Sequence, residues 1–304
     1  MSELYILKFV MRNNTEQTVS KVVKLRFYKD RYLPGTELSG KVIWTGSTED
    51  VVGIKLTAGG RLIHDGFPEY ITAARANGRQ EISFKSAGWS KLLAQNEPVP
   101  GLSYNVSLTT IMTDNTAIPN VTWEDNTPTV NYIYVKEHSS VWDAVTAYTK
   151  KAFGPFPYIL GTNKVMTRPV QGTLREYYSD VIKAVGETVD RRTVYSKVYM
   201  ADADGRYTYQ VQNMRAISDG LVREKYFPLD RQWLADPSDG ARYRMDLSAR
   251  RYYSPFLRVV GYSGEELFDR FLGVIGNESI SGMIGGLEVV FENGRAVTTV
   301  YILN

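Results

Sequence analysis

The chain has 304 residues, of which 43% are hydrophobic and 23% are charged. These values are typical of a globular protein with two or three domains, and they exclude a disordered or fibrous chain. With 36 basic and 33 acidic residues the net charge is +3. That charge is too small for the broad positive field that a nucleic-acid coat requires.

The residue types needed for several kinds of catalysis are scarce. There is no cysteine, which excludes disulfides, thiolate catalysis and zinc sites that use sulfur. The two histidines, His64 and His138, lie outside any metalloprotease motif, so we predict that both are solvated loop residues. The apolar run at residues 4–11 is short and is interrupted by Lys8, so it predicts neither a signal peptide nor a membrane span. We therefore expect a protein that stays in the cytoplasm until it is assembled.

The first part of the chain, residues 1–100, reads as β-structure. Strand-like runs at residues 3–11, 18–28, 40–46 and 51–58 are separated by Asn-Asn, Pro-Gly and Gly-Ser pairs. A further strand near residue 82 leads into a short helix near residue 89, before two prolines stop the chain. Short strands at this spacing predict a barrel or sandwich.

Residues 101–169 have a mixed pattern that predicts a small α+β domain. A helix is expected near residues 107–115 and a strand at 130–135. Ser140 and Asp143 have capping-box spacing at the start of a second helix, which ends before Gly154. The apolar face of this helix and the basic residues of its last turn are Val141, Val145, Tyr148, Ala152, Lys150 and Lys151. Residues 157–167 then predict a hairpin around a glycine-containing turn.

The remaining part, residues 170–304, returns to a β pattern. Residues 193–211 predict a hairpin, with its turn at 201–205. The pair Asn293-Gly294 is typical of a type I′ turn between two alternating strands. The fold class predicted from the sequence is therefore mainly β, with two β units flanking an α+β insert.

Two motifs suggest ligands, but simpler interpretations are favoured. Residues 35–42 fit the spacing of a phosphate-binding loop ending at Lys41, yet the following residues continue as a strand. Residues 240–258 interleave five arginines with aromatic residues, which could bind nucleic acid. Because Asp239 and Asp246 dilute that charge, we interpret this stretch as a solvated strand and loop that forms a protein interface.

The acidic residues Glu265, Glu266 and Asp269 are the one set that could serve as paired carboxylates of a glycosidase. They fall within one helical turn, so we interpret them as charges on the solvated start of a helix. Neither histidine has a plausible partner for a Ser-His-Asp triad. We therefore predict no catalytic, cofactor-binding or metal-ligating residues.

Three stretches, taken in order, resemble a known family. They are residues 82–100, residues 139–169, and the end of the chain at 262–274 and 287–303. Together they are similar to the hub proteins of phage tail baseplates, the late-control-D-like family, which includes the N-terminal parts of type VI secretion spikes. One departure is Ser139, which stands where the family has a glutamate.

The resemblance implies two tail-tube-like β-barrel domains, residues 1–100 and 170–304, flanking a small α+β domain at 101–169. It implies a homotrimer whose pseudo-sixfold ring joins a six-fold tail tube to a three-fold central spike. Expected partners are further copies of the chain, the tube protein, the spike or tail-tip protein and other baseplate proteins, with no cofactor, membrane or specific nucleic acid. The expected location is the virion baseplate, assembled in the host cytoplasm. The alternative is a cell-wall glycan hydrolase associated with a tail tip.

Overall fold

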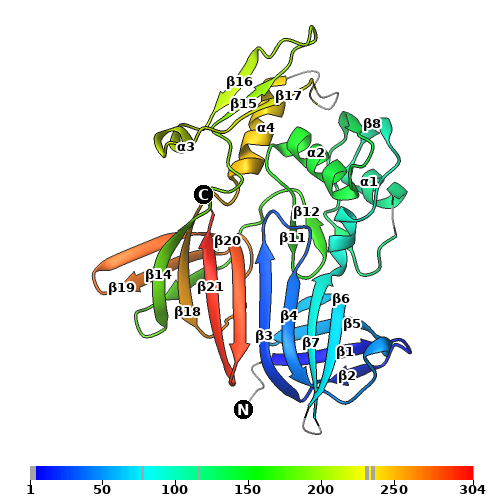
Figure 1. Cartoon of the computed structure of the whole chain (residues 1–304), viewed down its shortest axis with the longest axis vertical. Coiled ribbons are helices and arrows are strands. Elements are labelled where there is room, and N and C mark those ends of the chain that lie inside the picture. Colours follow the sequence, from blue (N-terminus) through cyan, green and yellow to red (C-terminus); the bar gives the residue numbers. More distant parts are fainter. Residues whose placement is uncertain (1–4, 77–78, 116, 230–232, 234–236, 304) are drawn as a thin grey trace.

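The computed structural model describes residues 5–76, 79–115, 117–229, 233 and 237–303. Its described strands form four sheets, and the largest has 13 strands. Figure 1 shows this large sheet at one end of an elongated molecule, with the smaller units stacked at the other end. The sequence prediction of a mainly β chain is confirmed.

The large sheet is built from both ends of the chain. Its strands are β1 (Tyr5–Met11), β2 (Glu16–Thr18), β3 (Lys21–Asp30), β4 (Glu37–Ile43), β5 (Val51–Ala58), β6 (Arg61–Ala76), β7 (Arg79–Gly88), β13 (Leu174–Tyr177), β14 (Ile182–Val189), β18 (Tyr253–Val260), β19 (Arg270–Ile275), β20 (Glu278–Glu292) and β21 (Arg295–Ile302). The pairing order is β14-β18-β21-β20-β3-β4-β7-β6-β5-β1-β2, and β19 pairs with β20 and β13 as a branch. A short 3-10 helix, η1 (Thr48–Asp50), precedes β5.

The two halves of this sheet join where β3 pairs with β20. The antiparallel register runs from Gly286 opposite Asp30 to Glu292 opposite Lys24. β3 also pairs with β4 along its other edge, so it belongs to both halves. The apolar core is shared as well, because buried side chains of β1, β3 and β7 cluster with those of β18, β20 and β21.

Two separate closed barrels are not what the described strands form. They make one continuous sheet, and no pairing in the described residues returns from β2 or β14 to close either half. The physical reason is the double use of β3. A strand that gives one edge to β4 and the other to β20 leaves no edge with which to close the first half upon itself.

The α+β part contains the two helices, the strand and the hairpin expected from the sequence, which are α1 (Leu108–Asn115), α2 (Val141–Phe153), β10 (Val130–Val135), and β11 (Tyr158–Leu160) with β12 (Lys164–Met166). It also contains two strands that were not predicted, β8 (Gly101–Val106) and β9 (Thr122–Trp123). The short helix expected near residue 89 is η2 (Trp89–Ala94). The capping box is present, because the Ser140 hydroxyl accepts from the backbone N–H of Asp143 while the Asp143 carboxylate accepts from that of Ser140. Strand β12 pairs with β11 and β9, so the predicted hairpin is confirmed. None of the helices described in the structure is long and apolar enough to cross a membrane.

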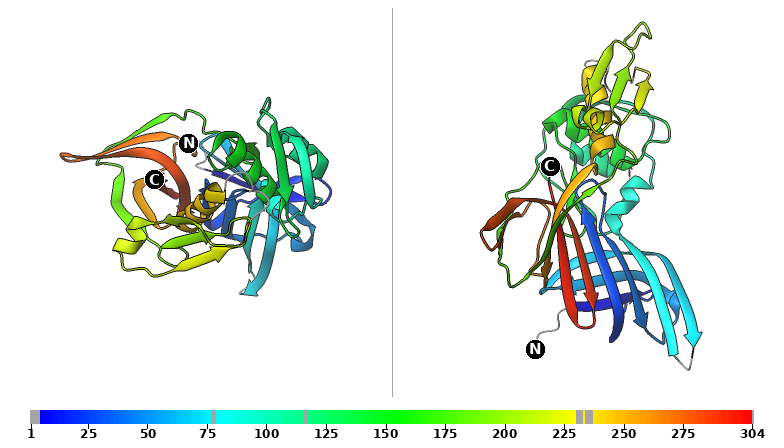
Figure 2. Two further views of the ribbon diagram at one scale, coloured as in Figure 1. Left: turned by 90° about the horizontal axis from the view of Figure 1, so that it is seen from above. Right: turned by 60° about the vertical axis from the view of Figure 1, so that its left-hand side comes forward.

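The third unit lies between β14 and β18 in the chain. A separate three-stranded sheet contains β15 (Lys197–Met200), β16 (Tyr209–Gln212) and β17 (Glu224–Phe227), and it is accompanied by α3 (Met214–Ser218) and α4 (Pro237–Ala249). The predicted hairpin forms as β15 and β16, in this small sheet rather than in the large one. Figure 2 shows this unit at the far end of the molecule from the large sheet.

The interpretation of residues 240–258 as strand and loop is wrong for its first half, which is helix α4. The helix forms because Ala241 and Met245 pack against Val198 and Met200 of β15, and this burial outweighs the high polarity of the stretch. The prediction is correct only from Tyr253 onward, where β18 begins.

The prediction that His64 is solvated is also wrong. Its side chain is fully buried within β6, where it bonds the hydroxyls of Thr36 and Ser86 at 2.8 Å each. Because the Ser86 hydroxyl donates to the carbonyl of Phe67, Nε2 of His64 carries the proton and Nδ1 accepts from Thr36. Burial lowers the pKa of His64 to about 3. His138, in contrast, is exposed, as predicted.

Stability is expected to fall with acid because of His64. Its folded-state pKa lies below the ordinary 6.5, so its contribution is complete above pH 6.5 and is lost as pH falls toward 3. Between pH 7 and 5 the native protein should lose about 2 kcal/mol more than a His64→Gln variant, which keeps a donor and an acceptor but cannot titrate. Urea unfolding at both pH values measures this, and equal losses would contradict the assignment.

Candidate functional site: a buried charge junction and an arginine-lined groove

The acidic residues Glu265, Glu266 and Asp269 do not lie on a solvated helix. They occupy the loop between β18 and β19, and Glu265 and Asp269 are only 3% and 4% exposed. The prediction is wrong because hydrogen bonds to residues distant in the sequence hold this loop in a non-helical conformation. Phe268 has a positive φ of 66°, which is incompatible with a right-handed helix and is a strained value for a bulky residue.

Each carboxylate in this loop already has several donors. Glu265 accepts from the Tyr177 hydroxyl at 2.9 Å and from the hydroxyl and N–H of Ser263. Asp269 accepts from Nε of Arg175 at 3.0 Å and from the N–H of Thr173 at 2.8 Å. Burial, helped by the negative charge of Glu265, raises the pKa of Tyr177. These acids therefore hold β13 against the loop.

Glu266 forms the central contact of the molecule with Lys29. Lys29 lies near the end of β3, is 2% exposed, and makes an ion pair with Glu266. Its ammonium also donates to the carbonyl of Gly161 in the β11–β12 turn at 2.7 Å, while Glu266 accepts from the N–H of Gly161 at 3.1 Å. One ion pair, between a buried lysine and a partly buried glutamate, thus ties the N-terminal half, the hairpin and the C-terminal half. Burial lowers the pKa of Lys29, and the charge of Glu266 opposes that shift.

The hairpin also contacts the first half of the sheet. Asn163 donates to the carbonyl of Asp65 in β6 at 3.0 Å and accepts from the N–H of Ser90 in η2 at 3.0 Å. On its other side, Tyr158 packs against Phe268 with ring centroids 4.5 Å apart. We infer from these contacts that the hairpin braces the two halves of the large sheet.

These contacts leave no acid–base pair of the kind a glycosidase needs. In the described residues, the three carboxylates are engaged by fixed donors, and none of them lines the large groove described below. No group of three or more described His, Asp or Glu residues is placed to hold a metal ion. The residues with phosphate-loop spacing do not form such a loop, because Lys41 lies within β4 and forms an ion pair with Glu81 at 3.0 Å.

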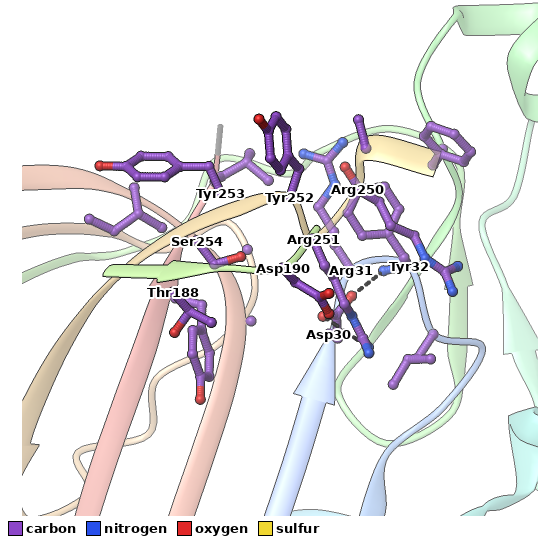
Figure 3. Close-up of a pocket in the computed structure, with 18 of the residues that line it drawn as sticks. Asp30, Arg31, Tyr32, Thr188, Asp190, Arg250, Arg251, Tyr252, Tyr253 and Ser254 are labelled. Atoms are coloured by element: carbon purple, nitrogen blue, oxygen red, sulfur yellow. Dashed lines mark hydrogen bonds and ion pairs between the residues drawn. The ribbon is translucent and has the colours of Figure 1, made fainter. Parts of the chain in front are cut away.

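A groove lies between the large sheet and the units stacked on it. Its volume is about 980 Å³. It is bordered by the ends of β3, β14 and β21, the middle of β20, the loop that follows α2, and the α4–β18 connection. Figure 3 shows Arg31, Arg250 and Arg251 grouped with Asp30 and Tyr32 at one end.

The groove is polar and rich in arginine. Its lining carries seven cationic side chains, Arg26, Arg31, Lys150, Arg192, Arg215, Arg250 and Arg251. Against them stand five carboxylates, Asp30, Glu37, Asp190, Asp246 and Glu288, an excess of two positive charges. The interpretation of residues 240–258 as an interface placed Arg250 and Arg251 among candidate contact residues. Arg31 and Lys29 were missed, because single charges in a strand-like run carry no signal of their tertiary surroundings.

Comparison with known proteins identifies the fold. A prophage MuSo2 43 kDa tail protein from Shewanella oneidensis matches with a TM-score of 0.72 and 11% identity, covering 100% of this chain and 97% of that one. A tail protein from Neisseria meningitidis matches with a TM-score of 0.71 and 12% identity over 98% and 95% of the two chains. The E. coli c3393 protein, a type VI secretion component, matches with a TM-score of 0.54 and 9% identity, covering 93% of this chain and 74% of that one.

No protein-family model matches the sequence, and no curated protein is similar enough in sequence to match. The chain therefore has the fold of these phage-type tail proteins, and at such low identity this likeness concerns the fold alone.

Removing the buried ammonium should destabilise the protein. A Lys29→Met variant leaves Glu266 and the carbonyl of Gly161 without their partner, so we expect a loss of about 3 kcal/mol in the free energy of unfolding. A Lys24→Met variant, which breaks the exposed pair with Glu292, should lose less than about 1 kcal/mol. Urea denaturation compares the two, and similar losses would show that the Lys29 pair does not hold the junction.

Proposed function

We propose that the protein is a structural hub of the baseplate of a phage or phage-like tail. Three copies would surround the tail axis and join a six-fold tail tube to a three-fold central spike. The observation that carries this proposal is the match, over nearly the whole of both chains, to a prophage tail protein. Residues 1–100 and 170–304 would supply the two tube-like β units, and residues 101–169 the spacer between them.

Partners follow from this proposal. The E. coli type VI component is described as structurally similar to the T4 tail proteins gp27 and gp5. By analogy, this chain would contact the tube protein on one side and a spike or tail-tip protein on the other, within the virion baseplate, after assembly in the host cytoplasm. Its role would be mechanical rather than enzymatic, which agrees with carboxylates that are fully engaged by structural donors.

The two ends of the large sheet support assembly. Strands β14 and β2 are the terminal strands of the pairing order, so each has an edge that no described strand covers. Exposed sheet edges promote pairing with other chains unless something covers them. A ring in which one surface of each copy meets a different surface of its neighbour would cover both edges.

Apolar side chains also reach the surface near one of these edges. Val185 of β14, Val260 of β18 and Ile275 of β19 are 44%, 44% and 39% exposed. Contact between copies would bury them. In the other half of the large sheet, Leu62 of β6 is 43% exposed, and contact between copies would bury it too.

Electron microscopy of the purified chain tests the ring directly. At micromolar concentration we expect threefold particles with a central hole, and mass photometry should give the mass of three chains. A Val185→Glu variant places a charge on the β14 edge and should lower the trimer population by about tenfold, since a desolvated charge there is costly.

The matched control is Val99→Glu, because Val99 is 84% exposed in the segment after η2 and lies in no strand. It should assemble like the native protein. A native chain that stays monomeric up to its solubility limit, and that binds neither a tail tube nor a spike protein, would contradict the proposal.

A further inference from the structure

We propose that the arginine-lined groove is a docking site for an acidic segment of another protein, held chiefly by Arg31, Arg250 and Arg251. The groove lies between the large sheet and the stacked units, away from the free edge of β2, and Thr188 near the end of β14 forms part of its lining. The inference goes beyond the hub proposal and stands on the charges and geometry of the groove itself.

Four of the groove's carboxylates are already committed to cations. Glu288 takes both Nε and Nη2 of Arg26, at 3.1 and 2.9 Å, and Asp190 pairs in the same two-pronged way with Arg192. The other two are paired with lysines, Glu37 with Lys91 at 3.0 Å and Asp246 with Lys150 at 3.6 Å. Two of these four carboxylates still act at the Tyr32 end, because hydrogen bonds from Arg192, helped by the charge of Arg251, lower the pKa of Asp190, and burial, helped by the charge of Asp246, raises that of Tyr32.

The guanidinium groups at the Tyr32 end of the groove have few ion-pair and hydrogen-bond partners among the described residues. In the described part of the chain, neither Arg31 nor Arg250 has a carboxylate partner, and Arg31 stacks over the ring of Tyr32 at 4.4 Å. Arg251 reaches Asp30 only at 3.5 Å, and its buried Nε has no hydrogen-bond partner in the structure. A buried donor without an acceptor is costly. The Arg251 side chain is 42% exposed as a whole, so a ligand would contact its guanidinium through atoms other than the buried Nε.

The fifth carboxylate, Asp30, orients this end of the groove. It accepts from the N–H of Tyr32 at 2.8 Å and from the Tyr28 hydroxyl at 3.0 Å, which keeps it turned toward β3. Burial raises the pKa of Tyr32, the charge of Arg31 lowers it, those of Asp30 and Asp246 raise it, and that of Arg250 lowers it. Figure 3 shows Arg31 and Arg250 at the same end of the groove as Tyr32. Three forked donors around one partly buried aromatic ring suit planar, two-oxygen acceptors.

A carboxylate-bearing peptide fits this groove better than a polynucleotide. The five lining carboxylates would repel a continuous phosphate backbone, whereas spaced Asp or Glu side chains can each meet one guanidinium. The segment would come from another protein, because this chain has no run of more than two adjacent acidic residues.

Fluorescence polarisation with a labelled peptide of alternating Glu and Gly tests the proposal at about 50 mM salt. We expect saturable binding that weakens as salt rises and is absent for the Gln-Gly peptide. An Arg31→Gln/Arg250→Gln variant should bind about tenfold more weakly, the loss of about 1.4 kcal/mol expected for charge-assisted contacts. An Arg31→Lys/Arg250→Lys variant keeps both positive charges but loses the planar, two-donor geometry of the guanidinium groups. It should bind the peptide with intermediate affinity.

The matched control is Arg79→Gln/Arg295→Gln, which removes the same charge from two exposed strand ends outside the groove. It should change the affinity less than about twofold. Native protein that does not bind, or equal weakening by the control, would overturn the proposal, as would an oligothymidylate of equal charge that binds as tightly. Thermal unfolding of each variant verifies folding, and mass photometry of the same samples reports ring assembly separately from peptide binding.

Discussion

The pairing of β3 with β20 is the constraint on which the rest of the structure depends. It brings together two segments more than 250 positions apart, as the side-chain pair of Arg26 and Glu288 illustrates. A sheet interface alone would fix the register but leave the angle of the stacked units free. The Lys29 ammonium fixes that angle, since it lies at the end of the same strand and contacts both the hairpin and the acidic loop. Strand β3 therefore supplies both the pairing that joins the two halves and the charged side chain that orients the stacked units.

This arrangement explains why the polar network is buried. Taking a lysine and a glutamate from water costs several kcal/mol, which only good geometry and additional hydrogen bonds offset. An apolar contact could supply comparable stability but would tolerate small rotations. The contacts of Glu266 with Lys29 and with the N–H of Gly161 have directional requirements instead. For a protein whose proposed task is to hold a fixed geometry between mechanical parts, we infer that this specificity matters more than the stability.

Much of the fold could be predicted from the sequence, because its signals are local. The capping box at Ser140 and the Asn293-Gly294 turn, where both residues have positive φ, are decided by neighbours in the chain. The errors share one cause. His64 and Glu265 are polar residues whose burial depends on partners far away in sequence, and α4 is a polar stretch made helical by packing on β15. The arginines of the groove were only partly anticipated for the same reason.

The double role of β3 has a consequence for biosynthesis. One edge of β3 is paired early, by β4, but the other must wait for β20, which is synthesised much later than β3. Until then the nascent chain displays an unpaired strand with an apolar face, a template for erroneous association with other chains. Basic residues such as Lys24 and Arg26 along this strand would discourage such contacts during translation. We infer that the surfaces with which the protein meets its neighbours are completed only after β20 has paired with β3.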